Sequence, residues 1–195
     1  MYTRRTIVRL GGWLFKRRTS LPVPLAVLLL VVPSHPFTAI PTLAGLVLIA
    51  AGESLRLWAV RHIGAISRTR SDRLGPVIAS GPFAYVRNPL YLGNIALWVG
   101  FTLAAGLAWL APLVAALLGF EYHAIVRWEE TMLDARHGDE YRAYRARVSR
   151  WIPDLSASSA SSAVGFSWPE TLFSERGTLI AIAVGLALLW IKARF

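Results

Sequence analysis

The sequence has no cysteine and only 11 acidic residues among its 195. Without cysteine, the chain can form no disulfide bond, no thiolate metal site and no cysteine nucleophile. Its four histidines are scattered and show no i, i+4 pair of the kind that places two metal ligands on one helix face, so we expect no metal site. These absences exclude thiol chemistry and leave little support for metal chemistry.

Apolar residues are abundant. They make up 55% of the chain, and the mean hydropathy is +0.48, which is higher than in ordinary soluble proteins. The formal net charge of +10 could indicate nucleic-acid binding. However, the basic residues lie mostly between apolar runs, as in the loops of membrane proteins, and no nucleic-acid motif accompanies them. We therefore expect an integral membrane protein with lipid neighbours and no nucleic-acid partner.

Five apolar segments predict the fold class. Leu21–Val32 is short and contains two prolines, whereas Pro41–Ile63 is long enough to cross a bilayer. The stretch from Leu90 to about Arg127 is interrupted by Ala105-Gly106, which favours two helices joined by a tight turn. Residues 177–191 form a last run of about 15 residues, which is marginal for spanning. We expect an all-α polytopic protein with four to five transmembrane helices.

The segments between these runs suggest one membrane domain over residues 1–195. Residues 1–20 form a basic N-terminus, and no small-residue cleavage site follows the first apolar run, so we expect that run to remain as a membrane helix. Residues 154–176 contain a serine-rich run and are predicted to be a linker before the last helix at 177–191.

The distribution of charge predicts the orientation. The segment 33–41 and the turn at Ala105-Gly106 carry no charge, whereas the segment 61–87 is rich in arginine. The N-terminus carries six cations, which are Arg4, Arg5, Arg9, Lys16, Arg17 and Arg18. By the positive-inside rule, the N-terminus and the loops at 61–87 and 127–153 are cytoplasmic, and we expect a bacterial inner membrane.

The most informative motif is Ser80–Gly93, which reads Ser-Gly-Pro-Phe-Ala-Tyr-Val-Arg-Asn-Pro-Leu-Tyr-Leu-Gly. Its Gly-Pro pair ends the preceding element. Asn88 can cap the next helix, and Pro89 suits the first helical position, where no backbone donor is needed. Arg87 and Tyr91 are therefore predicted to flank a helix N-terminus.

A second motif begins at the neighbouring carboxylates Glu129 and Glu130. Neighbours on a helix point about 100° apart, so we expect at most one of them to point inward. Gly138 is predicted to end the helix, and Tyr141 and Tyr144 would share one face of the next. The alternative is a cytoplasmic helix with solvated carboxylates and interfacial tyrosines.

Glu53 and Arg56 lie inside the second apolar segment. A lone charge there costs roughly 2.5 to 3.5 kcal/mol, so we expect the two to pair at i, i+3. They would either line a polar cavity, or lie near the helix end where Arg56 reaches the interface and Glu53 only accompanies it.

Taken together, these motifs carry a resemblance. From about Gly52 to Pro153, the chain resembles the membrane methyltransferase superfamily of isoprenylcysteine carboxyl methyltransferases and phospholipid N-methyltransferases. The resemblance implies a catalytic core at 52–153 with a helical cytoplasmic site for S-adenosylmethionine. It also implies methylation of a lipophilic acceptor that enters from the bilayer, either a phospholipid amine or an isoprenylcysteine-like carboxylate.

The resemblance also implies site residues. Catalytic roles would fall to Arg87, Glu130 and Glu53. Cofactor contacts would come from Gly81, Tyr85, Val86, Arg87, Asn88, Pro89, Tyr91, Glu129, Glu130 and Tyr141.

The chemistry of these residue types is compatible with such a site. A helix N-terminus beside Arg87 suits the carboxylate of the cofactor's methionine part. Glu129 or Glu130 could hold its ammonium group or a ribose hydroxyl, while a tyrosine packs on adenine or donates a hydrogen bond. If the acceptor is an amine, Glu53 or Glu130 could take its proton.

Two departures from the family pattern leave the acceptor open. Asn88 stands where these enzymes commonly have histidine, and His137 stands where a phenylalanine would precede Gly138. The Gly-rich loop of soluble methyltransferases is absent, so membrane helices must form the cofactor site. The alternative functions are an NADPH-dependent membrane reductase of the sterol reductase type and a non-catalytic membrane scaffold.

Overall fold

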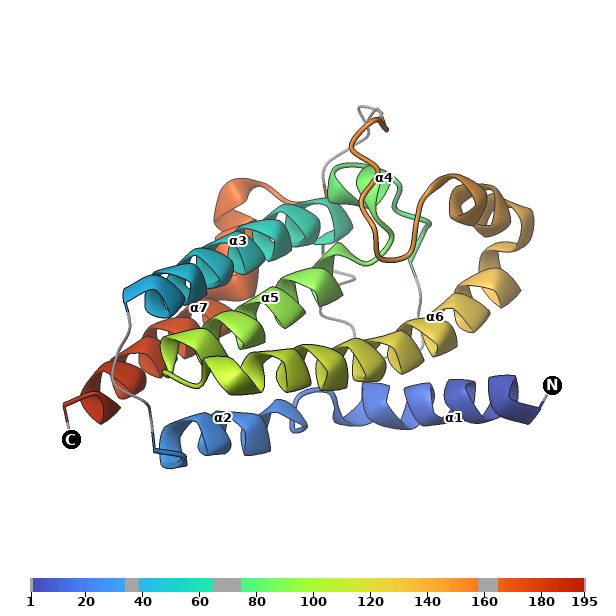
Figure 1. Cartoon of the computed structure of the whole chain (residues 1–195). Helices are drawn as coiled ribbons and strands as arrows, with labels where there is room; N and C mark the ends of the chain where they lie inside the picture. The colour runs from blue at the N-terminus through green and yellow to red at the C-terminus, as the bar shows by residue number, and fades with distance from the viewer. Residues whose placement is uncertain (1, 34–38, 65–74, 158–164, 195) are drawn as a thin grey trace.

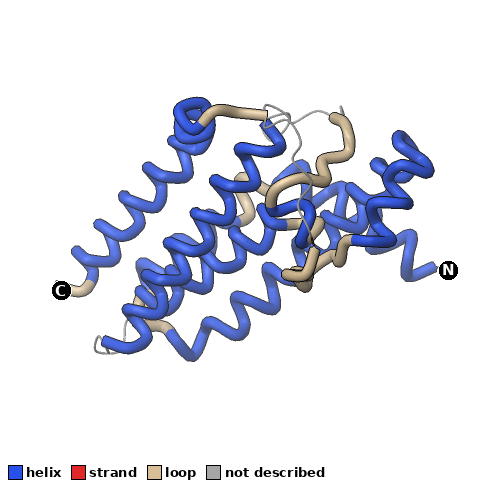
Figure 2. Tube along the Cα trace, turned by 90° about the horizontal axis from the view of Figure 1, so that it is seen from above, coloured by secondary structure: helices blue, strands red, loops and turns tan. Residues whose placement is uncertain are grey.

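The computed structural model describes residues 2–33, 39–64, 75–157 and 165–194, and all regular structure in these ranges is helical (Figures 1 and 2). The predicted all-α fold is therefore confirmed. The elements are α1 (Tyr2–Arg17), α2 (Pro22–Val31), α3 (Ala39–Ile63), α4 (Pro82–Tyr85), α5 (Pro89–Ala104), the 3-10 helix η2 (Ala108–Leu110), α6 (Ala111–Arg147) and α7 (Trp168–Lys192).

Three segments are long and apolar enough to cross a membrane, by length and composition: α3, η2 with α6, and α7. The helices α2 and α5 are also apolar but have only 10 and 16 residues. Large apolar side chains such as Ile40, Leu117 and Ile180 are exposed on the outside of the long helices, as expected for a surface that faces lipid. Each of the five predicted apolar segments is therefore a helix in the described part of the chain, and three of these helices have the length and composition to span a membrane.

Figure 1 shows α1 packed along α6, with α2 continuing from the end of α1, and α3 lying next to α5 and α7. The contact between α3 and α5 depends on glycine. A Cβ atom at Gly52 would lie 2.7 Å from the carbonyl oxygen of Gly93, and one at Gly45 would lie 2.6 Å from that of Gly100. Small residues let two helix backbones approach closely. This contact sets α3 directly against α5, the helix that begins within the first motif.

Helix α6 changes direction at Gly138, which has φ 51° and ψ −120°. A positive φ of this kind strains residues with a side chain, and the predicted break is confirmed. Beyond the break, Tyr141 and Tyr144 are both buried, and the Tyr144 hydroxyl donates to the carbonyl oxygen of Phe83 at 2.8 Å. The last turns of α6 therefore pack on the first motif.

The predicted boundary between the linker and the last helix is wrong. The last helix begins at Trp168, nine residues before the expected start at 177, so the linker assigned to 154–176 ends at Ser167. Ser167 accepts from the backbone of Glu170, and the Glu170 side chain accepts from the backbone of Ser167, which is a capping box. In addition, most of the basic N-terminus at 1–20 is helical, as α1. Most of the serine run lies outside the described residues.

Candidate functional site

A cavity of about 650 Å³ lies where α1, α3, α5, α6 and α7 meet. Its wall combines apolar side chains with polar ones that can fix the orientation of a small molecule. The polar and charged side chains of the wall are Arg18, Thr19, Arg56, Arg87, Asn88, Tyr91, Asn94, Tyr122, Glu129, Glu130, Tyr141, Tyr144, Glu175 and Thr178.

Most of the predicted cofactor residues lie on this cavity, although the two motifs are far apart in the sequence. Those that line it are Arg87, Asn88, Pro89, Tyr91, Glu129, Glu130 and Tyr141. Four predicted residues are not part of the wall: Glu53, Gly81, Tyr85 and Val86. The structure thus joins the two motifs at one site but places these four behind it.

The residues behind the wall shape the first motif. Gly81 has φ 56°, and a Cβ atom there would lie 2.4 Å from the ring of His62. Val86 is almost fully buried, and the Tyr85 ring packs near that of Trp58. Their positions account for the turn that presents Arg87 to the cavity, and their contact with a cofactor stays a prediction.

Ion pairs at Glu130 connect both motifs to the segment that follows α6. Arg150 donates two hydrogen bonds to Glu130, from Nε to Oε1 at 2.8 Å and from Nη2 to Oε2 at 2.7 Å. Arg87 Nη2 lies 3.2 Å from the same Oε1, and both Arg87 and Glu130 are almost completely buried. The hydrogen bonds to Glu130 raise the pKa of Arg150 above its usual value, which keeps its guanidinium group charged.

Arg87 keeps part of its hydrogen-bonding capacity unused. Its Nε and Nη1 are buried and have no hydrogen-bond partner in the structure. A buried cationic donor without a partner costs free energy, because it has lost water and gained nothing in exchange. The fork of a guanidinium group matches a carboxylate or a phosphate. This arrangement therefore fits an anionic group of a ligand bound in the cavity.

Backbone contacts hold the segment 148–154 against the first motif. The Arg87 amide donates to the carbonyl of Ser149 at 2.9 Å, and the Asp154 amide donates to that of Tyr85 at 2.9 Å. The Asn88 side chain donates to the carbonyl of Arg150 at 3.0 Å. Asn88 therefore occupies the cap position of α5 without capping it through its side chain, contrary to the prediction. The proline that follows it does occupy the first helical position, as predicted.

The second carboxylate, Glu129, has a different environment. Its Oε1 accepts a hydrogen bond from the Tyr91 hydroxyl at 2.9 Å, and the Tyr91 ring stacks on Tyr122 with centroids 4.7 Å apart. Both Glu129 and Glu130 line the cavity, so the expectation that at most one points inward is wrong. The cavity extends over enough of α6 to reach both side chains.

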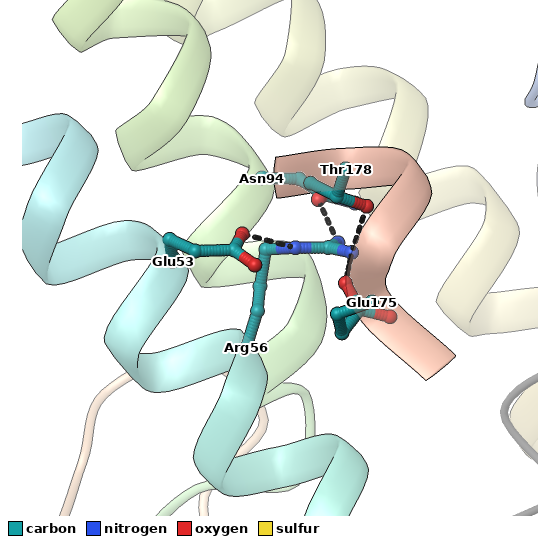
Figure 3. Close-up of polar contacts among 5 residues, drawn as sticks. All are labelled: Glu53, Arg56, Asn94, Glu175 and Thr178. Atoms are coloured by element: carbon teal, nitrogen blue, oxygen red, sulfur yellow. Dashed lines mark hydrogen bonds and ion pairs between the residues drawn. The ribbon is translucent and has the colours of Figure 1, made fainter. Parts of the chain in front are cut away.

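A polar cluster centred on Arg56 joins three helices at the cavity wall (Figure 3). Arg56 on α3 is bound by Glu53 at 3.2 Å, by Glu175 and Thr178 of α7, and by Asn94 of α5. The predicted pair of Glu53 and Arg56 is confirmed. The sequence left open whether Glu53 and Arg56 line a polar cavity. Arg56 does line the cavity, together with Asn94, Glu175 and Thr178, whereas Glu53 does not.

Comparison with known families adds an independent finding. Residues 40–140, about half of the chain, match the phospholipid methyltransferase family. The chain belongs to the phospholipid methyltransferase family. The apolar helices and this family together make it a membrane protein of a methyltransferase family, as the resemblance implied.

Two curated proteins are similar to this member of the phospholipid methyltransferase family. A protein of Haemophilus influenzae, described as uncharacterized, is 35% identical over 65 residues, which are 32% of this chain and the whole of that protein. The nickel-cobalt-cadmium resistance protein NccN of Alcaligenes xylosoxydans xylosoxydans is 29% identical over 101 residues, which are 52% of this chain and 44% of NccN. No solved structure matches the chain.

The structure adds site residues that lie outside the part matching the phospholipid methyltransferase family. Arg150 follows α6, and Glu175 and Thr178 lie on α7. The sequence patterns assign no role to Arg150. They place Glu175 in the predicted linker and Thr178 in the predicted last apolar helix. The capping box at Ser167 is the signal that α7 begins early enough to carry Glu175 to the cavity.

Proposed function

We propose that this protein transfers a methyl group from S-adenosylmethionine to a lipophilic acceptor. The observation that carries the proposal is the buried guanidinium of Arg87, which has two unused donors and lies in the cavity wall of a chain from the phospholipid methyltransferase family. When bound, the cofactor supplies a methyl group that its sulfonium has already activated.

Arg87 would hold the carboxylate of the cofactor's methionine part through Nε and Nη1. The first turn of α5 begins two residues later, at Pro89, and supports an anion here because the first N–H groups of a helix have no partner within the helix. Glu130 orients Arg87 by binding its third nitrogen. A positioning role therefore suits Glu130 better than a direct cofactor contact, because both its oxygens already accept hydrogen bonds from Arg150.

Glu129 would hold the positively charged amino group of the same ligand. Its carboxylate lines the cavity and, of the contacts that the structure shows, accepts a hydrogen bond from Tyr91 rather than from an arginine. Tyr141 lines the cavity beyond Glu130 and offers an aromatic face for the adenine ring. A positive group at one point and a negative group at another would orient a zwitterionic amino-acid moiety.

Positioning and exclusion of water supply most of the rate in such a reaction, since the methyl group needs no covalent help from the protein. The acceptor would be a phospholipid amine or an isoprenylcysteine-like carboxylate. An amine must lose a proton before or during attack. Glu130 is poorly suited to that task, because two arginines occupy it.

We also propose that the cavity lies on the cytoplasmic side of a bacterial inner membrane. Arg61 ends α3 and Arg87 precedes α5, so both lie at the opposite end of these helices from the uncharged turn at Ala105-Gly106. Arg150 follows α6 at the same end as the cavity. This distribution follows the positive-inside rule.

Calorimetric titration of the purified full-length chain in lipid nanodiscs tests the cofactor. We expect binding of S-adenosylhomocysteine and no comparable binding of NADPH. Tight binding of NADPH alone would favour a reductase and contradict the proposal, and binding of neither would favour a scaffold. Incubation with isotopically labelled S-adenosylmethionine and a lipid extract, followed by mass spectrometry, would then identify the methylated acceptor.

A further inference from the structure

Arg150 lies outside the part of the chain that matches the family, yet it holds the carboxylate next to Arg87. We propose that Arg150 is a positioning residue that keeps Arg87 available to bind an anion, by occupying Glu130. This inference rests on the proposed function, because the anion is taken to be the carboxylate of the cofactor.

The geometry of the three side chains supports this role. Arg150 donates to both oxygens of Glu130, at 2.8 and 2.7 Å, whereas Arg87 reaches only Oε1, at 3.2 Å. The remaining donors of Arg87, Nε and Nη1, are left without a partner. Because a carboxylate and a guanidinium group prefer a two-point pair, Glu130 would otherwise be the natural partner for two nitrogens of Arg87.

The charges lead to the same conclusion. One carboxylate between two guanidinium groups leaves the cluster with a net positive charge, which attracts an anion. A pair of Glu130 with Arg87 alone would be neutral, and Glu130 would already bind the guanidinium group of Arg87. Arg150 supplies the extra charge from a position that is not part of the described cavity wall, so it acts through Glu130 and not by touching the ligand.

The backbone keeps Arg150 at this distance. The Arg87 amide donates to the carbonyl of Ser149, and the Asn88 side chain donates to the carbonyl of Arg150. These hydrogen bonds join Arg87 and Asn88 to the backbone of Ser149 and Arg150. Arg150 therefore reaches Glu130 from a segment that is bound to the first motif.

A charge-deletion cycle tests this role in the full-length protein in nanodiscs. The variants are Arg150→Gln, Glu130→Gln, the double variant Arg150→Gln/Glu130→Gln, and the control Arg147→Gln. Arg147 is exposed, and the structure shows its side chain donating to the backbone carbonyl of Ala143. Calorimetry measures the affinity for S-adenosylhomocysteine and for methylthioadenosine, which has the same nucleoside but no amino-acid carboxylate.

We expect Arg150→Gln to weaken S-adenosylhomocysteine binding about tenfold to a hundredfold, which corresponds to the loss of one charge-assisted interaction. Methylthioadenosine should bind Arg150→Gln as it binds the wild type. The double variant should recover most of the lost affinity, because removing the charge of Glu130 releases Arg87 again. Arg150→Lys should fall between the wild type and Arg150→Gln, since lysine keeps the charge but not the two-point contact.

Three results would overturn the role of Arg150. They are equal weakening of both ligands, an affinity of Arg150→Gln equal to that of Arg147→Gln, and a double variant no better than Arg150→Gln. Should Arg150→Gln fail to fold, Arg150→Lys and the double variant, which leaves no unpaired carboxylate at position 130, make the same test. A wild-type protein that binds neither ligand would contradict the proposed function and this role with it.

Discussion

Arg87 shows how a single side chain can define a site. Its guanidinium group is buried, one nitrogen is paired with Glu130, and two nitrogens have no partner. Most buried polar groups in proteins are hydrogen-bonded, and this exception is the observation on which the proposed anion contact rests. The first motif predicts an anion site at this arginine, and the structure shows which of its nitrogens lack a partner.

Replacement of Arg87 should affect ligand binding more than stability. We expect Arg87→Gln to weaken S-adenosylhomocysteine binding by about a hundredfold, because a charged, two-point contact is lost. Arg87→Lys should recover only part of the affinity, since an ammonium group cannot form the fork. Calorimetric titration measures both, with Arg142→Gln as the control because Arg142 is exposed and pairs with Asp134 and Asp139. Unchanged affinity in Arg87→Gln would contradict the assignment of this site.

At the scale of the elements, the contact between α3 and α5 sets the relative position of Arg56 and the first motif. Glycines at 45 and 52 meet glycines at 100 and 93, with backbone against backbone. The same contact places Arg56 next to Asn94, the residue that follows Gly93. A membrane helix pair gains its stability from such packing, because lipid provides little hydrophobic force between helices.

A methyl group at this contact should therefore be costly. A Cβ atom at Gly52 would lie 2.7 Å from the Gly93 carbonyl oxygen, so the helices would have to separate. We expect Gly52→Ala to destabilise the protein by about 1–3 kcal/mol. Gly119→Ala is the matched control, because Gly119 also lies inside a long helix but a Cβ atom added there would have no neighbour within 4 Å. Thermal unfolding in nanodiscs compares them, and an equal melting temperature for both variants would rule out the close contact.

At the scale of the whole molecule, the Arg56 cluster joins helices that are far apart in the sequence. Glu175 lies 119 residues after Arg56, and Asn94 lies 38 residues after it. The cluster is partly buried, with Glu53 and Glu175 fully so, and it connects α3, α5 and α7 around one guanidinium group (Figure 3). Such a cluster attaches α7, most of whose surface is exposed, to the rest of the molecule.

Removal of the shared cation should loosen α7. Arg56→Met deprives Glu53 and Glu175 of the guanidinium between them, and breaking a buried ion pair costs about 3–5 kcal/mol. Thermal unfolding should show a large loss relative to the control Arg176→Met, which removes an exposed arginine of α7. The further change Glu175→Gln should restore part of the stability, because it removes one of the two carboxylates. Equal melting of Arg56→Met and Arg176→Met would show that the cluster does not hold the helices together.

The absence of cysteine offers a direct test of orientation. Single cysteines introduced at Ala108 and Ser156, both exposed, are the only thiols of their variants. Treating intact bacterial cells with a maleimide that cannot cross the inner membrane should label Ala108→Cys, whereas Ser156→Cys should react only after the membrane is opened. Both should react in detergent, which serves as the control. The opposite labelling pattern would invert the proposed topology.

Local signals predict much of this fold and part of its site. Pro89 begins α5, Gly138 breaks α6, and Glu53 pairs with Arg56, because each depends on backbone geometry or on neighbours within one helical turn. The predicted capping role of the Asn88 side chain is wrong, because this side chain depends on a residue that is distant in the sequence. Its partner is a carbonyl 62 residues away, which competes with the local cap.

Hydropathy and helix signals act over short distances, so the linear order of residues was enough to indicate an all-helical membrane protein and to single out two polar motifs as candidates for its site. How those motifs meet depends on packing. The folded chain places both Glu129 and Glu130 on the cavity, commits Glu130 to two arginines, and leaves two nitrogens of Arg87 without a partner. A buried charge is compensated by whichever groups packing brings near it, and packing joins residues that no local pattern connects.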